Sequence, residues 1–119
     1  MIPDRVIATA DARALLARIV AQNGAVMFHQ SGGCCDGSAP MCYPVGEFPL
    51  GPHDVQLGVI DGADFWMSGA QFEVWKHTQI ILASAPGSGA AFSLDNGGSE
   101  RFVIQSRVFS DAEMDQLKI

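Results

Sequence analysis

The sequence predicts a single mainly β domain of the α+β class over residues 1–119, folded as a twisted two-layer sheet with an N-terminal helix and a short C-terminal helix. Thirteen glycines and six prolines in 119 residues place turns close together, which favours short strands over long helices. Hydrophobic residues make up 48% of the chain, enough to fill one core without disulfides. Helix signals occur near both ends, with short apolar and alternating segments between them.

Residues 10–22 are expected to form the N-terminal helix. Thr9 can cap its first turn, and Asn23-Gly24 can end it because glycine accepts the left-handed conformation that follows a last helical turn. One face of this helix is apolar and consists of Ala12, Leu15, Leu16, Ile19 and Val20.

The middle of the chain predicts three strands. Residues 25–29 are a short apolar run bounded by turn residues, which indicates a buried strand. Residues 43–52 contain three prolines and cannot form a regular helix. Segments 54–60 and 63–67 flank the turn dipeptide Asp61-Gly62 and are expected to pair as a hairpin. The alternation places three apolar side chains of the first hairpin strand on one face: Val55, Leu57 and Val59.

The second half of the chain predicts three more strands and the closing helix. Residues 71–77 fit a strand and a helix equally well. Strands are expected at 78–83, 91–94 and 101–108, separated by segments rich in glycine, proline and asparagine.

The C-terminal helix is predicted by its capping residues. Ser110 and Glu113 have the spacing of a capping box, in which each side chain bonds the other residue's backbone N–H group. Met114 and Leu117 give this short helix an apolar edge. A helix is therefore expected to begin just after Ser110.

The charge and hydropathy of the chain exclude two classes of partner. The net charge is −6 and Lys and Arg do not cluster, so we expect no nucleic-acid binding. No segment approaches the roughly 18 consecutive apolar residues of a membrane helix, and no basic stretch followed by an apolar run marks a signal peptide. We expect a cytoplasmic protein that binds neither nucleic acid nor membrane.

The three cysteines lie together in a glycine-rich segment, at Cys34, Cys35 and Cys42. Thiols stay reduced in the cytoplasm, so clustered cysteines there indicate metal binding or redox chemistry. Three thiolates could bind zinc, iron or an iron–sulfur cluster, although the spacing lacks the two-residue gap typical of zinc sites. The simpler alternative is that one or two of these cysteines are small buried hydrophobic residues.

Two histidines are candidates to complete this site. His29 precedes the cysteine segment and His77 lies between two predicted elements, and either could ligate a metal or act as a base toward a thiol. His53 follows a proline in a polar turn and is expected to face solvent. The candidate metal ligands are therefore Cys34, Cys35, Cys42, His29 and His77.

The cysteine segment and its flanks resemble a known family. Met27–Ser38 with the following Pro40-Met41-Cys42, the block Trp75–Thr78 and the block Gly89–Leu94 are similar to a small bacterial family catalogued as domain of unknown function 779. Members are often encoded beside aldehyde dehydrogenases, so the resemblance implies a companion of such an enzyme. It implies no catalytic residue.

A fainter similarity exists to the HesB-like iron–sulfur biogenesis proteins. Gly32-Gly33-Cys34 and the segment Gly89–Phe92 occur in the order found there. Those proteins also carry a cysteine pair near the C-terminus, and this chain has no cysteine after Cys42. The similarity therefore implies a HesB-like fold without the same cluster site.

Three functions follow as hypotheses. The first is a cytoplasmic accessory protein of aldehyde dehydrogenase metabolism with a cysteine-rich metal or redox site. The second is a thiol-dependent enzyme with Cys34 or Cys35 as nucleophile and His29 or His77 as base. The third is a non-catalytic oligomeric interaction module whose cysteines are packed. A homodimer is expected from the apolar composition and short strands.

Overall fold

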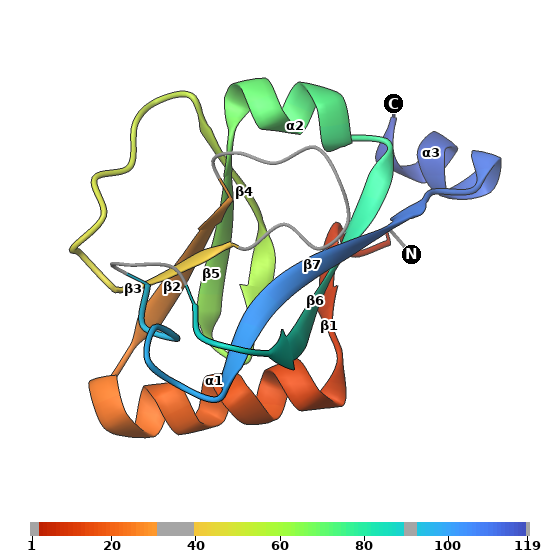
Figure 1. The fold of residues 1–119 in the computed structure, drawn as a ribbon. Coiled ribbons are helices and arrows are strands. Elements are labelled where there is room, and N and C mark those ends of the chain that lie inside the picture. The colour runs from red at the N-terminus through yellow and green to blue at the C-terminus, as the bar shows by residue number, and fades with distance from the viewer. Residues whose placement is uncertain (1–2, 31–39, 90–92, 119) are drawn as a thin grey trace.

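The computed structural model describes residues 3–30, 40–89 and 93–118, and these residues form two β-sheets and three helices (Figure 1). The three-stranded sheet has the order β1-β6-β7, with β1 (Val6–Ala8) parallel and β7 (Glu100–Val108) antiparallel to β6 (Thr78–Pro86). The four-stranded sheet has the order β3-β2-β5-β4. Its strands are β2 (Val26–Gln30), β3 (Met41–Pro44), β4 (Asp54–Ile60) and β5 (Ala63–Ser68).

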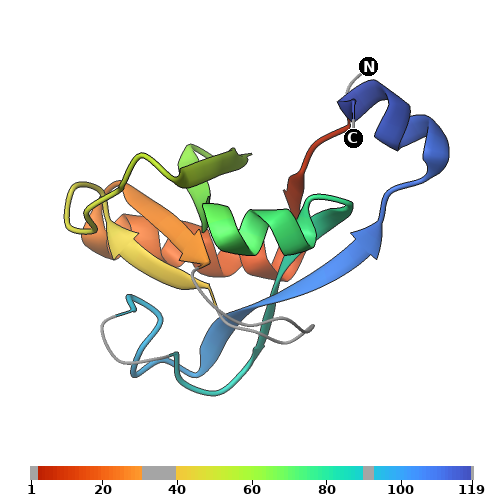
Figure 2. The same cartoon turned by 90° about the horizontal axis from the view of Figure 1, so that it is seen from above.

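Three helices surround these sheets. Helix α1 (Ala10–Asn23) runs along one side of the molecule, and α2 (Gly69–Trp75) lies on the opposite side in Figure 1. Helix α3 (Asp111–Leu117) stands beyond the end of the sheets in both Figure 1 and Figure 2. The predicted mainly β, two-layer architecture with helices near both ends is confirmed.

Helices α1 and α3 begin where capping side chains were predicted. Thr9 Oγ1 accepts a hydrogen bond from the Ala12 N–H group at 3.2 Å. The full predicted capping box is present at the start of α3. The ambiguous segment 71–77 belongs largely to a helix, because Ser68 Oγ accepts from the Gln71 N–H group and caps α2.

The structure corrects the strand expected at 91–94. Residues 91 and 92 lie outside the described residues, and Ser93 and Leu94 lie in a bend and turn rather than a strand. The Ser93 hydroxyl and the Leu94 N–H group bond the backbone of Cys42, which lies on β3, an edge strand of the four-stranded sheet. The two short strands β1 and β3 were not predicted, since their three and four residues carry too little alternation.

The predicted single apolar face of residues 54–60 is also wrong in part. The pairing of β4 with β5 shifts register between Gln56 and Gly58, so Leu57 is the extra residue of a β-bulge. After the bulge the alternation is inverted: Val59 is 56% exposed, whereas Ile60 is buried. A pattern with a period of two cannot reveal an inserted residue.

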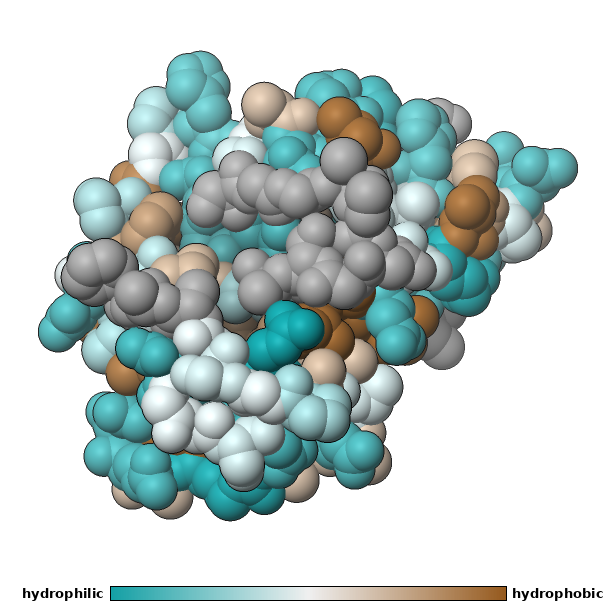
Figure 3. Space-filling view, in the orientation of Figure 1, coloured by the Kyte–Doolittle hydropathy of each residue, from teal (hydrophilic) through white to brown (hydrophobic). Residues whose placement is uncertain are grey.

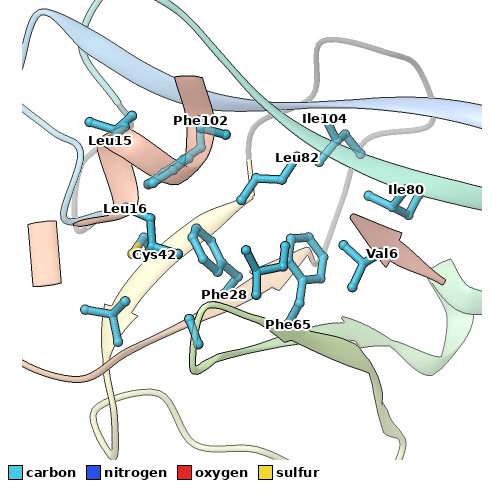
Figure 4. Packing of buried hydrophobic residues seen from close by; sticks show 14 of the residues in the cluster. Val6, Leu15, Leu16, Phe28, Cys42, Phe65, Ile80, Leu82, Phe102 and Ile104 are labelled. Carbon is cyan, nitrogen blue, oxygen red and sulfur yellow. The ribbon is translucent and has the colours of Figure 1, made fainter. Parts of the chain in front are cut away.

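The core lies between the two sheets and is built around aromatic rings (Figure 4). Phe28 stacks on Phe65 of the same sheet, with ring centroids 5.6 Å apart. Its ring is also nearly perpendicular to that of Phe102 in the other sheet, with centroids 4.9 Å apart. Leu15 and Leu16 of α1 add the helical side of this cluster.

The two sheets meet along both sides of the core. On one side β1 lies beside β4, where a Cβ at Gly58 would come within 3.0 Å of Val6 Cγ1. This close approach explains a glycine inside a strand.

On the other side, the turn that precedes β7 joins β3 to β7. Cys42 donates its N–H to Ser93 Oγ at 3.0 Å and accepts from the Leu94 N–H group at 2.9 Å. The Ser93 hydroxyl donates to Asp95 Oδ1, and Asp95 Oδ2 accepts from the Phe102 N–H group at 2.8 Å. We call this connection the Asp95 clamp.

The surface carries only scattered hydrophobic residues in the described part of the chain. The coloured residues of Figure 3 are mostly hydrophilic, with small separate hydrophobic patches. The exposed large hydrophobic residues are Ile7, Val45, Leu50, Val59, Val74 and Val108. Single apolar residues on a surface are ordinary, so the expected homodimer stays a prediction. None of the described helices has the length and apolar character needed to cross a membrane.

Candidate functional site

His29 is a buried histidine that faces away from the core. Side chains alternate along β2, so Phe28 enters the core and His29 lies on the opposite face of the four-stranded sheet. Its side chain is 3% exposed, and Nε2 lies 2.9 Å from Oδ1 of Asp54. A buried imidazole paired with a carboxylate is held in one orientation.

Asp54 holds this imidazole from the first residue of β4. Its second oxygen, Oδ2, accepts from the Gly51 N–H group at 2.8 Å. The Gly51 N–H group, and after it the His29 side chain, hold the pKa of Asp54 below its usual value. An ionised Asp54 can only accept, so the hydrogen in this contact belongs to His29 Nε2. In the neutral imidazole Nδ1 is then the nitrogen that carries the lone pair.

An aromatic residue from the proline-containing segment packs against the imidazole. The ring centroid of Phe48 lies 4.5 Å from that of His29 and 4.9 Å from that of Tyr43. Phe48 belongs to the loop between β3 and β4, so this loop lies over the outer face of the sheet. Phe48 thus contributes to the burial of the imidazole, which is 3% exposed.

Cys42 lies on the other face of the same sheet. It pairs with Phe28 in the register of β2 and β3, and its side chain is fully buried in the core beside Leu16 and Phe28 (Figure 4). Burial, and then the charge of Asp95, raise the pKa of the Cys42 thiol to about 12. This cysteine is protonated at neutral pH and matches the packed alternative.

The other sequence-predicted candidates lie apart from His29 or outside the described residues. His77 is exposed in the turn before β6, in the other sheet, and His53 is exposed as expected. Cys34 and Cys35 fall in residues 31–39, outside the described part of the chain. Within residues 3–30, 40–89 and 93–118, no group of three His, Cys, Asp or Glu side chains could hold a metal ion.

Asp54 is the site residue that the sequence did not reveal. It lies 25 positions from His29 and reads as the ordinary start of a strand. The two residues meet because β5 pairs with both strands, placing Trp66 beside His29 and Ser68 beside Asp54. No local pattern carries that information.

Comparisons with known proteins support one assignment. Neither a curated protein nor a solved structure matches the chain significantly. The sequence model of one protein family matches residues 15–108, which is most of the chain and includes His29, the cysteine segment and Asp54. The chain therefore belongs to the domain of unknown function 779 (DUF779) family.

Proposed function

We propose that this protein is a metal-binding accessory protein of aldehyde dehydrogenase metabolism whose ligands are His29, Cys34 and Cys35. The observation that supports the proposal is the buried pair of His29 and Asp54, directly before the cysteine segment. Metal-binding histidines commonly bond a carboxylate through their second nitrogen, which fixes the ring and raises its basicity.

The ligand set is smaller than the five residues considered from sequence. Cys42 is left out because its thiol is buried in the core and protonated at neutral pH. His77 is left out because it is exposed in the turn before β6. One imidazole and two thiolates suit zinc or iron with one further position for another ligand. An iron–sulfur cluster is less favoured, because such clusters are usually held by four cysteines.

The aldehyde dehydrogenase enters the proposal through the family. The family resemblance implies a companion of such an enzyme, and the chain belongs to that family. We expect the protein to bind a co-expressed aldehyde dehydrogenase from the same gene neighbourhood. Capture of that enzyme by wild-type protein, with no capture of an unrelated dehydrogenase, would support the partnership.

The metal proposal is tested by metal analysis of protein purified without a histidine tag. We expect one metal ion per chain in the wild type and in the exposed control His53→Gln, and loss of metal in His29→Gln. Asp54→Asn should lower metal affinity about 10- to 100-fold, because the imidazole loses its orienting carboxylate. Metal far below one per chain in the wild type, or full retention in His29→Gln, would contradict the proposal.

A thiol-dependent enzyme is the second candidate, and the same pair of residues favours it. An imidazole oriented by a carboxylate can accept a proton from a cysteine, as in thiol enzymes. For this candidate we expect fast, pH-dependent alkylation of Cys34 or Cys35 in metal-free protein. The His29→Gln variant should lose this pH dependence. Slow alkylation with an ordinary thiol profile counts against this candidate. If serine replacements of the cysteines lower the stability of the protein but leave partner binding intact, the result would instead support the interaction module with packed cysteines.

A further inference from the structure

Both asparagines of this chain, Asn23 and Asn96, are followed by glycine. In an Asn-Gly dipeptide the glycine nitrogen can attack the side-chain amide carbon, because glycine has no side chain to hinder the approach. The two sites share this dipeptide but differ in their neighbours, Gln22 and Ala25 at one and Asp95 and Gly98 at the other. A comparison in denaturant therefore separates the effect of sequence from that of structure.

The Asn23 site is held by the end of helix α1. Asn23 Nδ2 donates to the Ile19 carbonyl at 2.9 Å, and the Gly24 N–H group donates to the Val20 carbonyl at 2.8 Å. Both the amide and the attacking nitrogen are tied to helix carbonyls, which accept hydrogens but have none to give. This site has no group among its described contacts that could pass a proton from the nitrogen to the amide oxygen.

The Asn96 site is arranged differently, in the exposed turn before β7. The hydroxyl of Ser88 contacts both reacting groups: it accepts from the Gly97 N–H group at 2.6 Å and donates to Asn96 Oδ1 at 3.1 Å. Its other acceptor, the Gly89 carbonyl, is farther away at 3.3 Å. One hydroxyl thus joins the nucleophile's hydrogen to the oxygen that must receive a proton.

We propose that Asn96-Gly97 is a site of self-catalysed deamidation in which Ser88 relays the proton. The Gly97 nitrogen forms a bond to Asn96 Cγ while its hydrogen passes to Ser88 Oγ and the Ser88 hydroxyl hydrogen passes to Asn96 Oδ1. In the neutral tetrahedral intermediate, that hydrogen then moves from Oδ1 to Nδ2. The Cγ–Nδ2 bond breaks, ammonia departs, and a cyclic succinimide remains. Water opens the ring to aspartate or isoaspartate, without oxidation or reduction.

The product changes the charge at a cavity of the protein. Asn96 lines a hollow of about 310 Å³ between α1 and the turn before β7, together with the ion-paired Arg18 and Glu100. The light-blue turn lies beside α1 in Figure 1. A carboxylate at position 96 adds a negative charge to this hollow.

The test follows amide loss at both asparagines during incubation of folded protein at neutral pH, by peptide mapping with isoaspartate detection. We expect deamidation at Asn96 and little at Asn23. Ser88→Ala should slow the reaction at Asn96 by about tenfold or more, and Ser88→Thr should retain it. In denaturant the two sites should react at similar rates, which shows that structure causes the difference.

Three results would overturn the proposal. The first is equal rates at Asn23 and Asn96 in the folded protein. The second is an unchanged or faster reaction in Ser88→Ala, which would mean that the hydroxyl only restrains the Gly97 nitrogen. The third is loss of the reaction in Ser88→Thr as well as in Ser88→Ala. Asn96→Gln serves as the blank for position 96, because its longer side chain forms the ring poorly.

Discussion

Cys42 and His29 belong to neighbouring strands and have opposite environments. The register pairs Cys42 with Phe28, so its thiol enters the core, while the next residue of β2 turns His29 to the outer face. Side chains alternate between the two faces of a sheet, so a shift of one position along the strand decides whether a side chain enters the core or lies on the outer face. Residue type alone therefore made both of them equal candidates for one site.

The Cys42 environment predicts a thiol that resists alkylation. In a variant with Cys34→Ser and Cys35→Ser, Cys42 is the remaining cysteine. A pKa of about 12 in place of 9.0 lowers its thiolate fraction about a thousandfold at neutral pH, and burial blocks the reagent further. We expect slow alkylation in buffer and fast alkylation in denaturant, measured by mass spectrometry. Fast alkylation of the folded variant would mean that the thiol is reachable.

Helix α3 owes its position to side-chain bonds at its first turn. The structure buries none of its residues, and its start is fixed by the capping box and by Arg107, which binds both oxygens of Glu113 at 2.9 Å. Arg107, and then the Ser110 N–H group, lower the pKa of Glu113 to about 2 from 4.5. A helix of seven residues is marginal by itself, so these bonds carry much of its stability.

The lowered pKa of Glu113 predicts an acid-sensitive α3. Because the folded pKa lies below the unfolded one, the stabilisation is complete above about pH 4.5 and is lost as pH falls towards 2. We expect α3 to be less stable in Glu113→Gln than in the wild type near pH 6. The difference in stability between the two proteins should close near pH 2. Amide exchange in 110–117 measures this effect. The exposed control Glu47→Gln should not show it, and a constant gap would refute the assignment.

The Asp95 clamp, in contrast to α3, is held by buried polar groups. Asp95 is 4% exposed and accepts hydrogen bonds from both Ser93 and the backbone of Phe102. Gly89 lies against it, and a Cβ there would overlap Oδ1 of Asp95. The clamp therefore needs both a carboxylate at position 95 and no side chain at position 89.

Asp95→Asn should destabilise the protein by about 2 kcal/mol, because an amide replaces one of two buried acceptors with a donor and leaves a partner unsatisfied. Gly89→Ala should also destabilise, by forcing the Asp95 carboxylate to move. Urea unfolding measures both changes, with Glu47→Gln as the exposed acidic control. Wild-type stability in both variants would show that the clamp does not hold the two sheets.

The whole molecule is two sheets closed around one aromatic cluster. The Phe28 ring touches both sides, through Phe65 in its own sheet and Phe102 in the other. The sheets meet at Gly58 and Val6 along one side and through the Asp95 clamp along the other. Loss of the Phe28 ring should therefore lower the stability of the whole fold rather than that of a single strand.

Phe28→Ala should lower the free energy of unfolding by about 4 kcal/mol, the cost of a cavity in place of a buried ring. Val74→Ala is the matched control, since Val74 is 65% exposed on α2 and should change stability by less than about 0.5 kcal/mol. Chemical denaturation monitored by circular dichroism compares the two. Similar effects from both variants would contradict a single cooperative core.

The sequence by itself determined what depends on neighbours along the chain. Thr9, Ser110 and Glu113 predicted the starts of α1 and α3, Asp61-Gly62 predicted the hairpin, and apolar runs predicted the central strands. Capping, turn geometry and alternation act over a few residues, so a local pattern carries them.

Only the tertiary structure decided what depends on residues far apart. It inverted the face of Val59 through a bulge, buried Cys42 in the core and brought Asp54 to His29 across an intervening strand. It also gave two identical Asn-Gly dipeptides different surroundings. Strand register and sheet order set these contacts, and they arise from the packing of the whole chain rather than from any short segment.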